Sequence, residues 1–321
     1  MKKPATNMAA SVRQRLMNIF REKGGEFQVL LIRYALERFL FRLSQTAYQP
    51  QFCLKGAMMF VFWGGEPHRP TRDLDLLGYG TNTISALESI FREICLCPVV
   101  PDGIEFLSET VKGVEIKHND EYHGVRITLT ARLDQALIPL QIDIGFGDLV
   151  VPAPQEAFFP TLLEMPAPQL RMYCRETVVA EKFQALVELG MGNTRLKDFY
   201  DIWVLIQRYE FEGTQLSQAI SATFTRRMTP LVAEPPLALT KQFALDPTKN
   251  SQWKGFLKKN RFSSSLELVQ ITTDLWKFFS KPVAALVSGV ALSEIWIPAD
   301  GWKKPHPDWF NQEIKPNQHR L

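Results

Sequence analysis

The chain has 321 residues, of which 45% are hydrophobic and 22% are charged. This composition excludes a disordered or fibrous protein, and the length allows one large domain or two ordinary ones with their own cores. The formal net charge of +3 permits a polyanionic partner without requiring one, because attraction to nucleic acid depends on a local basic patch.

The cysteines and the apolar segments limit the cellular setting. Four scattered cysteines are too few for a disulfide framework, so we expect reduced thiols. No stretch has the continuous apolar length of a signal peptide core or of a membrane span. We therefore expect a cytoplasmic protein without a membrane partner.

The first third of the chain alternates helices with a short strand. Apolar residues at helical spacing predict helices over residues 10–20 and 26–44, separated by Gly24 and Gly25. Residues 71–77 read as a strand closed by Gly78, and residues 84–94 repeat as one helix face.

The middle of the chain is strand-rich. Residues 125–133 alternate apolar and polar side chains, and residues 138–144 do the same. This period of two is typical of half-buried strands, and Asp134-Gln135 between them supplies a turn. The pattern predicts an antiparallel hairpin.

The last part of the chain is predicted to be helical. Residues 151–168 are rich in proline and suggest a linker or a wrapped loop. Helical spacing follows in several segments, the last of which is expected to end near Pro282, and the stretch from Pro298 reads as a loose tail. We therefore divide the chain into residues 1–165, with helices and an α/β segment, and a helical domain over residues 166–321.

The main chemical signal is Asp73-Leu74-Asp75. Residues two apart on a strand point to the same face, so both carboxylates project together. Adjacent carboxylates repel one another, and a divalent cation such as Mg²⁺ or Mn²⁺ relieves that repulsion. Paired aspartates that simply face water are the common alternative, because a short motif alone is weak evidence.

Asp143 offers a third carboxylate on a predicted strand, opposite its apolar face. If this strand lies beside the first, three aspartates converge and could hold two metal ions roughly 4 Å apart, the geometry of in-line nucleotidyl displacement. One metal would lower the pKa of an attacking hydroxyl, and the other would stabilise the leaving pyrophosphate.

A small-residue turn precedes the aspartates. Leu54-Lys55-Gly56-Ala57 is expected to bring backbone amides close to a triphosphate at a helix N-terminus. Arg72 flanks the aspartates and could bind phosphate bidentately, although loop arginines are more often in solvent. The order of turn, helix and Asp-x-Asp resembles the nucleotidyltransferase superfamily signature, with Ala57 in place of its second small residue.

Two downstream blocks make the resemblance more specific. They are Glu176-Thr-Val-Val-Ala-Glu-Lys182 and Asn193-Thr-Arg-Leu-Lys-Asp198-Phe-Tyr-Asp201-Ile-Trp. Together with Leu54-Lys-Gly-Ala and Arg69-Pro-Thr-Arg-Asp73-Leu-Asp75, they resemble the AbiEii/AbiGii family, the nucleotidyltransferase-like toxins of bacterial abortive-infection toxin–antitoxin systems. The similarity runs from the second predicted helix to about Ile206 and, more faintly, to the region of Pro282.

The resemblance implies an α/β (α+β) fold: a minimal nucleotidyltransferase core with a mixed sheet, preceded by N-terminal helices and followed by a helical C-terminal domain. It implies that Asp73 and Asp75 bind metal, that Lys182 contacts the triphosphate, and that Asp198, in preference to Asp201, completes the site. The residues themselves leave open a purely structural ion pair between Lys182 and Asp198.

The function implied is metal-dependent transfer of a nucleotide from a nucleoside triphosphate to an acceptor such as transfer RNA, which blocks translation. A cognate antitoxin would restrain the enzyme. Transfer to a protein or a small molecule such as an aminoglycoside is an alternative on the same core. A decayed nucleotide-binding protein, suggested by Ala57, and a metal-dependent nuclease are further alternatives.

Overall fold

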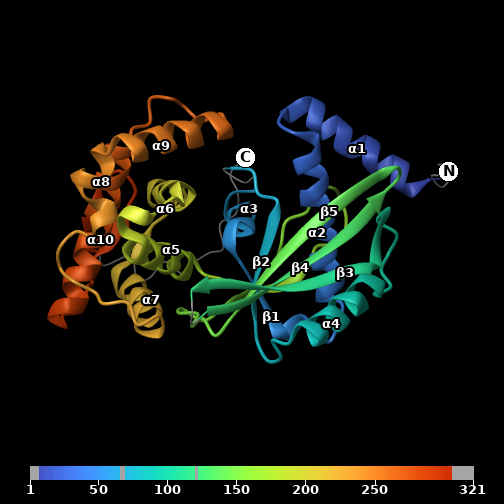
Figure 1. Ribbon diagram of the computed structural model, residues 1–321, viewed down its shortest axis with the longest axis horizontal. Coiled ribbons are helices and arrows are strands. Elements are labelled where there is room, and N and C mark those ends of the chain that lie inside the picture. The colour runs from blue at the N-terminus through green and yellow to red at the C-terminus, as the bar shows by residue number, and fades with distance from the viewer. Residues whose placement is uncertain (1–6, 66–68, 120–121, 306–321) are drawn as a thin grey trace. The chain divides into compact units, whose positions relative to one another are not determined.

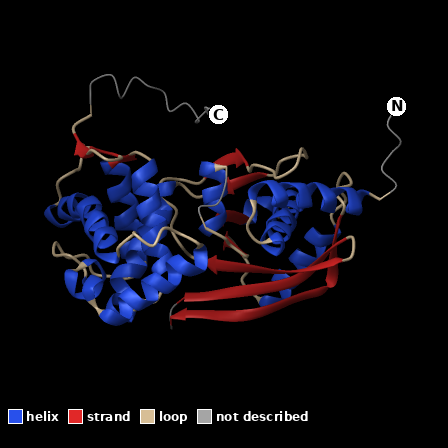
Figure 2. Cartoon of the chain, turned by 90° about the horizontal axis from the view of Figure 1, so that it is seen from above, coloured by secondary structure: helices blue, strands red, loops and turns tan. Residues whose placement is uncertain are grey.

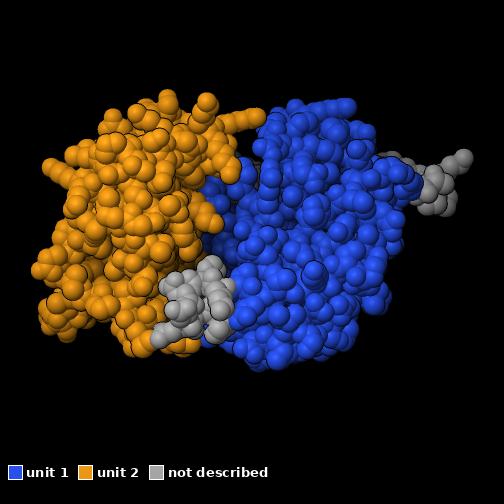
Figure 3. All heavy atoms as spheres, viewed as in Figure 1, with its two compact units in different colours: residues 1–148, 153–173 blue, residues 149–152, 174–321 orange. Residues whose placement is uncertain are grey.

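The computed structural model describes residues 7–65, 69–119 and 122–305 and divides into two compact units. Unit 1 comprises residues 1–148 and 153–173, and unit 2 comprises residues 149–152 and 174–321 (Figure 3). The division after Tyr173 falls eight residues beyond the boundary expected after residue 165.

Unit 1 combines helices with a sheet. Its helices are α1 (Met8–Lys23), α2 (Phe27–Ser44), α3 (Met59–Gly64) and α4 (Ile84–Leu96). Its strands are β1 (Phe52–Lys55), β2 (Asp73–Gly78), β3 (Ile104–Asn119), β4 (Tyr122–Leu133), β5 (Ala136–Phe146), β6 (Gln155–Phe158) and β7 (Gln169–Met172). The proline-rich segment expected to be a linker therefore contains β6, which pairs with β7.

The seven strands of unit 1 form one mixed sheet in the order β3-β4-β5-β2-β1-β7-β6. Figure 1 labels the strands β1 to β5 of this sheet. β4 and β5 are antiparallel partners, which confirms the predicted hairpin. β5 runs parallel to β2, and β1 runs parallel to β7. The parallel neighbours β2 and β5 place residues that are far apart in sequence side by side at the centre of the sheet.

The two faces of this sheet differ in character. Ile138, Leu140, Ile142 and Ile144 of β5 are at most 2% exposed and belong to the core, and the helices of unit 1 gather on one face (Figure 2). The alternate residues, among them Asp143, remain partly accessible. This alternation is the reason that polar chemistry collects on one side of the sheet.

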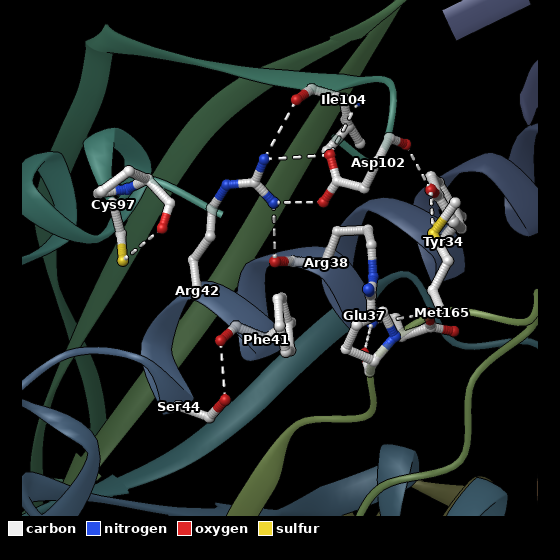
Figure 4. Close-up of polar contacts among 12 residues, drawn as sticks. Tyr34, Glu37, Arg38, Phe41, Arg42, Ser44, Cys97, Asp102, Ile104 and Met165 are labelled. Atoms are coloured by element: carbon white, nitrogen blue, oxygen red, sulfur yellow. Dashed lines mark hydrogen bonds and ion pairs between the residues drawn. The ribbon is translucent and has the colours of Figure 1, made fainter. Parts of the chain in front are cut away.

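A buried ion pair ties α2 to the start of β3 (Figure 4). Arg42 donates from both terminal nitrogens to the Asp102 carboxylate, at 2.7 and 3.1 Å, and it also donates to the Ile104 carbonyl. The Tyr34 hydroxyl donates to the Asp102 carbonyl at 2.6 Å. Removing either charge would leave the other buried, so the pair fixes where α2 meets the sheet.

Glu37 lies on α2 next to Arg38 (Figure 4), and it makes the stability of the fold depend on pH. Burial raises the pKa of this carboxyl from 4.5 to about 7, against the opposing effects of Arg38 and of the Leu162 amide that donates to it. Because the folded-state pKa is the higher one, the folded protein holds this proton more tightly. Its stabilising contribution is complete below about pH 4.5 and is lost as the pH rises through about 7.

The corresponding prediction concerns Glu37→Gln, which mimics the protonated acid. We expect the free energy of unfolding of the wild type, relative to the variant, to fall between pH 5 and pH 8 because only the wild type must bury a charge at the higher pH. Urea unfolding of both proteins at the two pH values measures this. Equal differences at both pH values would contradict the assignment.

Unit 2 is mainly helical. Its helices are α5 (Arg175–Leu189), α6 (Leu196–Arg208), α7 (Gly213–Arg226), α8 (Lys241–Leu245), α9 (Pro247–Asn260) and α10 (Leu268–Ser288). A small sheet in the order β10-β9-β8 is formed by β8 (Phe211–Glu212), β9 (Ile295–Ile297) and β10 (Gly301–Lys303).

The structure corrects two predictions near the C-terminus. α10 does not end near Pro282 but continues to Ser288 and stops at Gly289, which has φ 71°. Proline has no N–H for the Phe278 carbonyl, and the Trp302 indole donates to this carbonyl instead, at 2.9 Å. The stretch predicted to be a loose tail from Pro298 therefore begins with an ordered segment that includes β10. Residues 306–321 lie outside the described part of the chain.

The described architecture confirms a mixed α/β fold with N-terminal helices, a seven-stranded mixed sheet and a helical C-terminal part. All four cysteines are free thiols, as expected. Among the helices that are described, none is long and apolar enough to cross a membrane.

Candidate functional site

The strand β2 presents two carboxylates on one face. Leu74 and Leu76 are 0% and 1% exposed, whereas Asp73 and Asp75 are partly accessible. The alternation is the one expected for a half-buried strand. Thr71, just before the strand, donates its hydroxyl to Asp73 Oδ1 at 2.7 Å and so orients that carboxylate.

The third aspartate lies beside the first two. β5 pairs with β2 in a register that places Asp143 opposite Asp75. Asp73, Asp75 and Asp143 each offer a carboxylate oxygen within 4.8 Å of the others. Three partly exposed carboxylates with oxygen donors at this separation suit a hard divalent cation such as Mg²⁺ or Mn²⁺.

An arginine that the sequence analysis did not single out completes this group. Arg126 on β4 pairs in register with Asp143. Its Nε and terminal nitrogen donate to the two oxygens of Asp143, each at 2.8 Å. These hydrogen bonds, together with the charges of Asp143, Asp73 and Asp75, raise the pKa of Arg126. The sequence did contain this pairing. In an antiparallel hairpin, residues at equal distances from the turn lie opposite each other, and Arg126 and Asp143 are at equal distances from the predicted turn.

The small-residue turn approaches the carboxylates closely. β1 runs antiparallel to β2 with Lys55 opposite Asp75, and Gly56 follows with φ 72°. A Cβ built on Gly56 would lie 1.9 Å from Asp75 Oδ2. Glycine is therefore required here for two reasons: the left-handed backbone and the space taken by the carboxylate. Ala57 is 8% exposed and lies in the short 3-10 turn Gly56–Met58 that leads into α3.

The cations of unit 1 that were expected to bind nucleotide have protein partners. Lys55 Nζ bonds to Asp148 Oδ2 at 2.8 Å and lies 5.2 Å from the Tyr173 ring centre. Arg72 bonds to Glu26 at 2.7 Å, with both side chains more than half exposed. Exposed ion pairs of this kind contribute only about 0–1 kcal/mol, so an anionic ligand can displace Glu26 from Arg72 at little cost.

Gly56 carries the first mutational prediction for this site. Gly56→Ala is expected to lower the nucleotide transfer implied by the sequence resemblance at least about a hundredfold, because its Cβ displaces Asp75 and a shift of about 1 Å at a reacting centre can cost that much. Steady-state assays measure the loss. Gly24→Ala is the matched control, because Gly24 has the same φ of 72° and nothing within 4 Å of its Cβ position. Equal activity of the two variants would contradict the close-approach argument.

Unit 2 contains the other residues expected at the site. Lys182 on α5 donates to Asp198 Oδ1 at 2.7 Å and to Asp201 Oδ2 at 2.8 Å, both on α6. Both aspartates are 0% exposed, and Lys182 is 12% exposed. The two bonds from Lys182 are nearly equal in length, so by themselves they give no preference for Asp198 over Asp201.

The charge state of Asp198 follows from its neighbours. Burial by itself would raise the pKa of Asp198, but Lys182 and Arg195 outweigh it and hold the pKa below its ordinary value. Arg195 Nε lies 2.8 Å from Asp198 Oδ2. Asp198 is therefore a carboxylate at neutral pH, and Lys182 faces two buried negative charges.

A cavity of about 430 Å³ opens in unit 1. Its lining includes Arg72, which precedes Asp73, and Gln141, which pairs in register with Asp73. Three threonine side chains, Thr110, Thr128 and Thr130, add hydroxyl groups to the wall. The cavity thus offers polar groups beside the strands that carry the aspartates.

Comparison with known proteins gives one family and several solved structures. A family model described as nucleotidyl transferase AbiEii toxin, type IV toxin–antitoxin system, matches residues 38–279. No curated protein matches the chain.

Two solved structures illustrate the structural similarity. JHP933 from Helicobacter pylori is 17% identical, with 82% of this chain and 93% of that chain covered and a TM-score of 0.46. MenT4, the nucleotidyltransferase toxin Rv2826c from Mycobacterium tuberculosis H37Rv, is 15% identical, with 87% and 98% covered and a TM-score of 0.48.

Proposed function

Since this chain belongs to the AbiEii nucleotidyl transferase toxin family of type IV toxin–antitoxin systems, we propose that it transfers a nucleotide from a nucleoside triphosphate to transfer RNA and thereby blocks translation. It is a nucleotidyltransferase, and its family implies a nucleoside triphosphate as substrate and an antitoxin as partner. The cytoplasm, where triphosphates and transfer RNA are available, is its proposed place of action.

The observation that carries the chemistry is the convergence of Asp73, Asp75 and Asp143 beside the backbone of Gly56. We propose that the three carboxylates hold Mg²⁺ or Mn²⁺. A divalent metal bound there would lower the pKa of the attacking hydroxyl and stabilise the negative charge of the leaving pyrophosphate. The acceptor hydroxyl gives up its proton to solvent and its oxygen forms a bond to the α-phosphorus. The bond between the α-phosphorus and the oxygen that bridges to the β-phosphate breaks, and pyrophosphate leaves.

The remaining residues have proposed roles in binding the triphosphate. Lys55, Gly56 and Ala57 line its path, with Gly56 providing room for close approach. Arg72 and Lys182 supply positive charge, and each must exchange a carboxylate partner for a phosphate oxygen. Asp198 or Asp201 orients Lys182 in this proposal. The cavity lined by Gln141 and the threonines offers room for the acceptor group.

The assignment of transfer RNA is tested in cells. Induced expression in a bacterial host without the antitoxin is expected to arrest protein synthesis, and transfer RNA isolated after arrest should be heavier by whole nucleotides in mass spectrometry. Expression of the Asp73→Ala, Asp75→Ala double variant is the control and should do neither. Arrest with unmodified transfer RNA and a nucleotide found on protein would contradict the RNA acceptor while retaining the chemistry.

A further inference from the structure

Arg126 is directly bonded to Asp143, one of the three carboxylates of the candidate site. It lies on β4, opposite Asp143 on β5, and it satisfies both oxygens of that carboxylate with two hydrogen bonds of 2.8 Å. Its side chain is 36% exposed, so it reaches the carboxylate from the open face of the sheet. A bidentate pair of this geometry is among the stronger polar contacts in proteins.

The charges around Arg126 show which groups it neutralises. Its pKa is raised first by the hydrogen bond to Asp143, with further contributions from the charges of Asp143, Asp73 and Asp75. The guanidinium therefore balances the repulsion within the carboxylate group, which is also what a divalent cation would do. Both cations would act on the same three side chains.

The two cations are poorly compatible at Asp143. A metal bound to either Asp143 oxygen would lie within a few ångströms of the guanidinium, because both oxygens already accept from it. Like charges at such separations repel strongly when the site is partly shielded from water.

We propose that Arg126 is a resident counter-ion of Asp143 that competes with the divalent cation and so weakens metal binding at the site. This inference rests on the proposed metal site of Asp73, Asp75 and Asp143. Arg126 is thus a positioning residue that acts through Asp143. The opposite role, in which an outer arginine holds the ligand in place and strengthens metal binding, predicts the opposite sign.

The test measures Mn²⁺ affinity and does not depend on turnover. Metal-free full-length protein is titrated with Mn²⁺, and free Mn²⁺ is followed by its electron paramagnetic resonance signal. Arg126→Gln is expected to bind Mn²⁺ about tenfold more tightly than the wild type, because the Asp143 oxygens are released. Arg126→Lys, which keeps the charge but loses the bidentate geometry, should give a smaller gain.

Arg132→Gln is the matched control. Arg132 lies on the same strand and the same face as Arg126 and bonds to Glu105 at 3.0 Å, away from the aspartates. Its removal changes the net charge by the same amount, and we expect unchanged Mn²⁺ affinity. Thermal unfolding of each variant verifies that it is folded, and Arg126→Lys provides the comparison if Arg126→Gln is unstable.

A second set of variants isolates the competition at Asp143. Asp143→Asn should weaken Mn²⁺ binding modestly in the wild type and at least about tenfold in the Arg126→Gln background, where Asp143 is fully available. Mn²⁺ affinity that falls or stays the same in Arg126→Gln, with binding by the wild type intact, would overturn the counter-ion role alone. Absence of Mn²⁺ binding in every protein would overturn the proposed metal site and the counter-ion role with it.

Discussion

Asp75→Asn is expected to lower the rate of nucleotide transfer about a thousandfold while leaving the fold intact. Asp75 lies on the central strand β2, where a Cβ on Gly56 would clash with its carboxylate and where Asp143 is its register partner on β5. Asparagine keeps the shape but removes the negative charge, and the loss of several kcal/mol of stabilisation of the transition state corresponds to about this factor.

Single-turnover rates at saturating triphosphate measure this effect without interference from product release. Glu105→Gln is the matched control, because Glu105 is an exposed carboxylate on β3 of the same sheet and pairs with Arg132. A rate within a few-fold of wild type for Asp75→Asn would contradict the proposed role of β2. Equal losses in both variants would point to a general charge effect.

Lys182→Met is expected to destabilise the protein by about 3–5 kcal/mol, because it leaves Asp198 and Asp201 buried with one fewer positive partner. Both aspartates are fully buried, and Asp198 also pairs with Arg195. Urea unfolding measures the loss. A change of less than about 1 kcal/mol would contradict the structural importance of this triad.

A compensated variant separates this structural role from a role in binding the triphosphate. Lys182→Met combined with Asp198→Asn and Asp201→Asn removes the buried charges together, so we expect most of the stability to return. If Lys182 contacts the triphosphate, this stable variant still requires a much higher triphosphate concentration for half-maximal rate. Recovery of wild-type kinetics would assign Lys182 to the structure alone.

The local parts of the site follow from the sequence for simple geometric reasons. A period of two places Asp73 and Asp75 on one face, and a clear turn at Asp134 fixes the β4–β5 hairpin. Gly56 is recognisable in the sequence as part of a small-residue turn, and a glycine is needed there because the backbone passes very close to the Asp75 carboxylate. These features depend on neighbours in sequence or on one well-marked turn.

Other parts depend on contacts between distant segments. That Asp143 meets Asp75 requires β5 to pair with β2 in parallel, across a connection that no local pattern specifies. The pairing of Lys55 with Asp148 is of the same kind, since nothing in the motif marks Asp148. The hairpin register could have predicted that Arg126 lies opposite Asp143. The contact was not predicted because an arginine on the polar face of a strand is ordinarily solvated.

Pro282 shows how a tertiary contact can override a local rule. Proline usually ends a helix because it leaves a carbonyl without its partner. Here Trp302 donates to the Phe278 carbonyl and stacks on the Phe278 ring, with centroids 5.7 Å apart. The same contact holds β10 against α10, so one interaction accounts for both wrong predictions about the C-terminal region.

The central claim is that Asp73, Asp75 and Asp143 support nucleotide transfer, and one assay tests it most directly. Purified protein is incubated with each of the four α-labelled nucleoside triphosphates, Mg²⁺ or Mn²⁺, and separated total RNA and protein. We predict label in a transfer RNA band that disappears in the Asp73→Ala, Asp75→Ala double variant. Equal labelling by wild type and double variant, or triphosphate binding without label in any fraction, would contradict the claim.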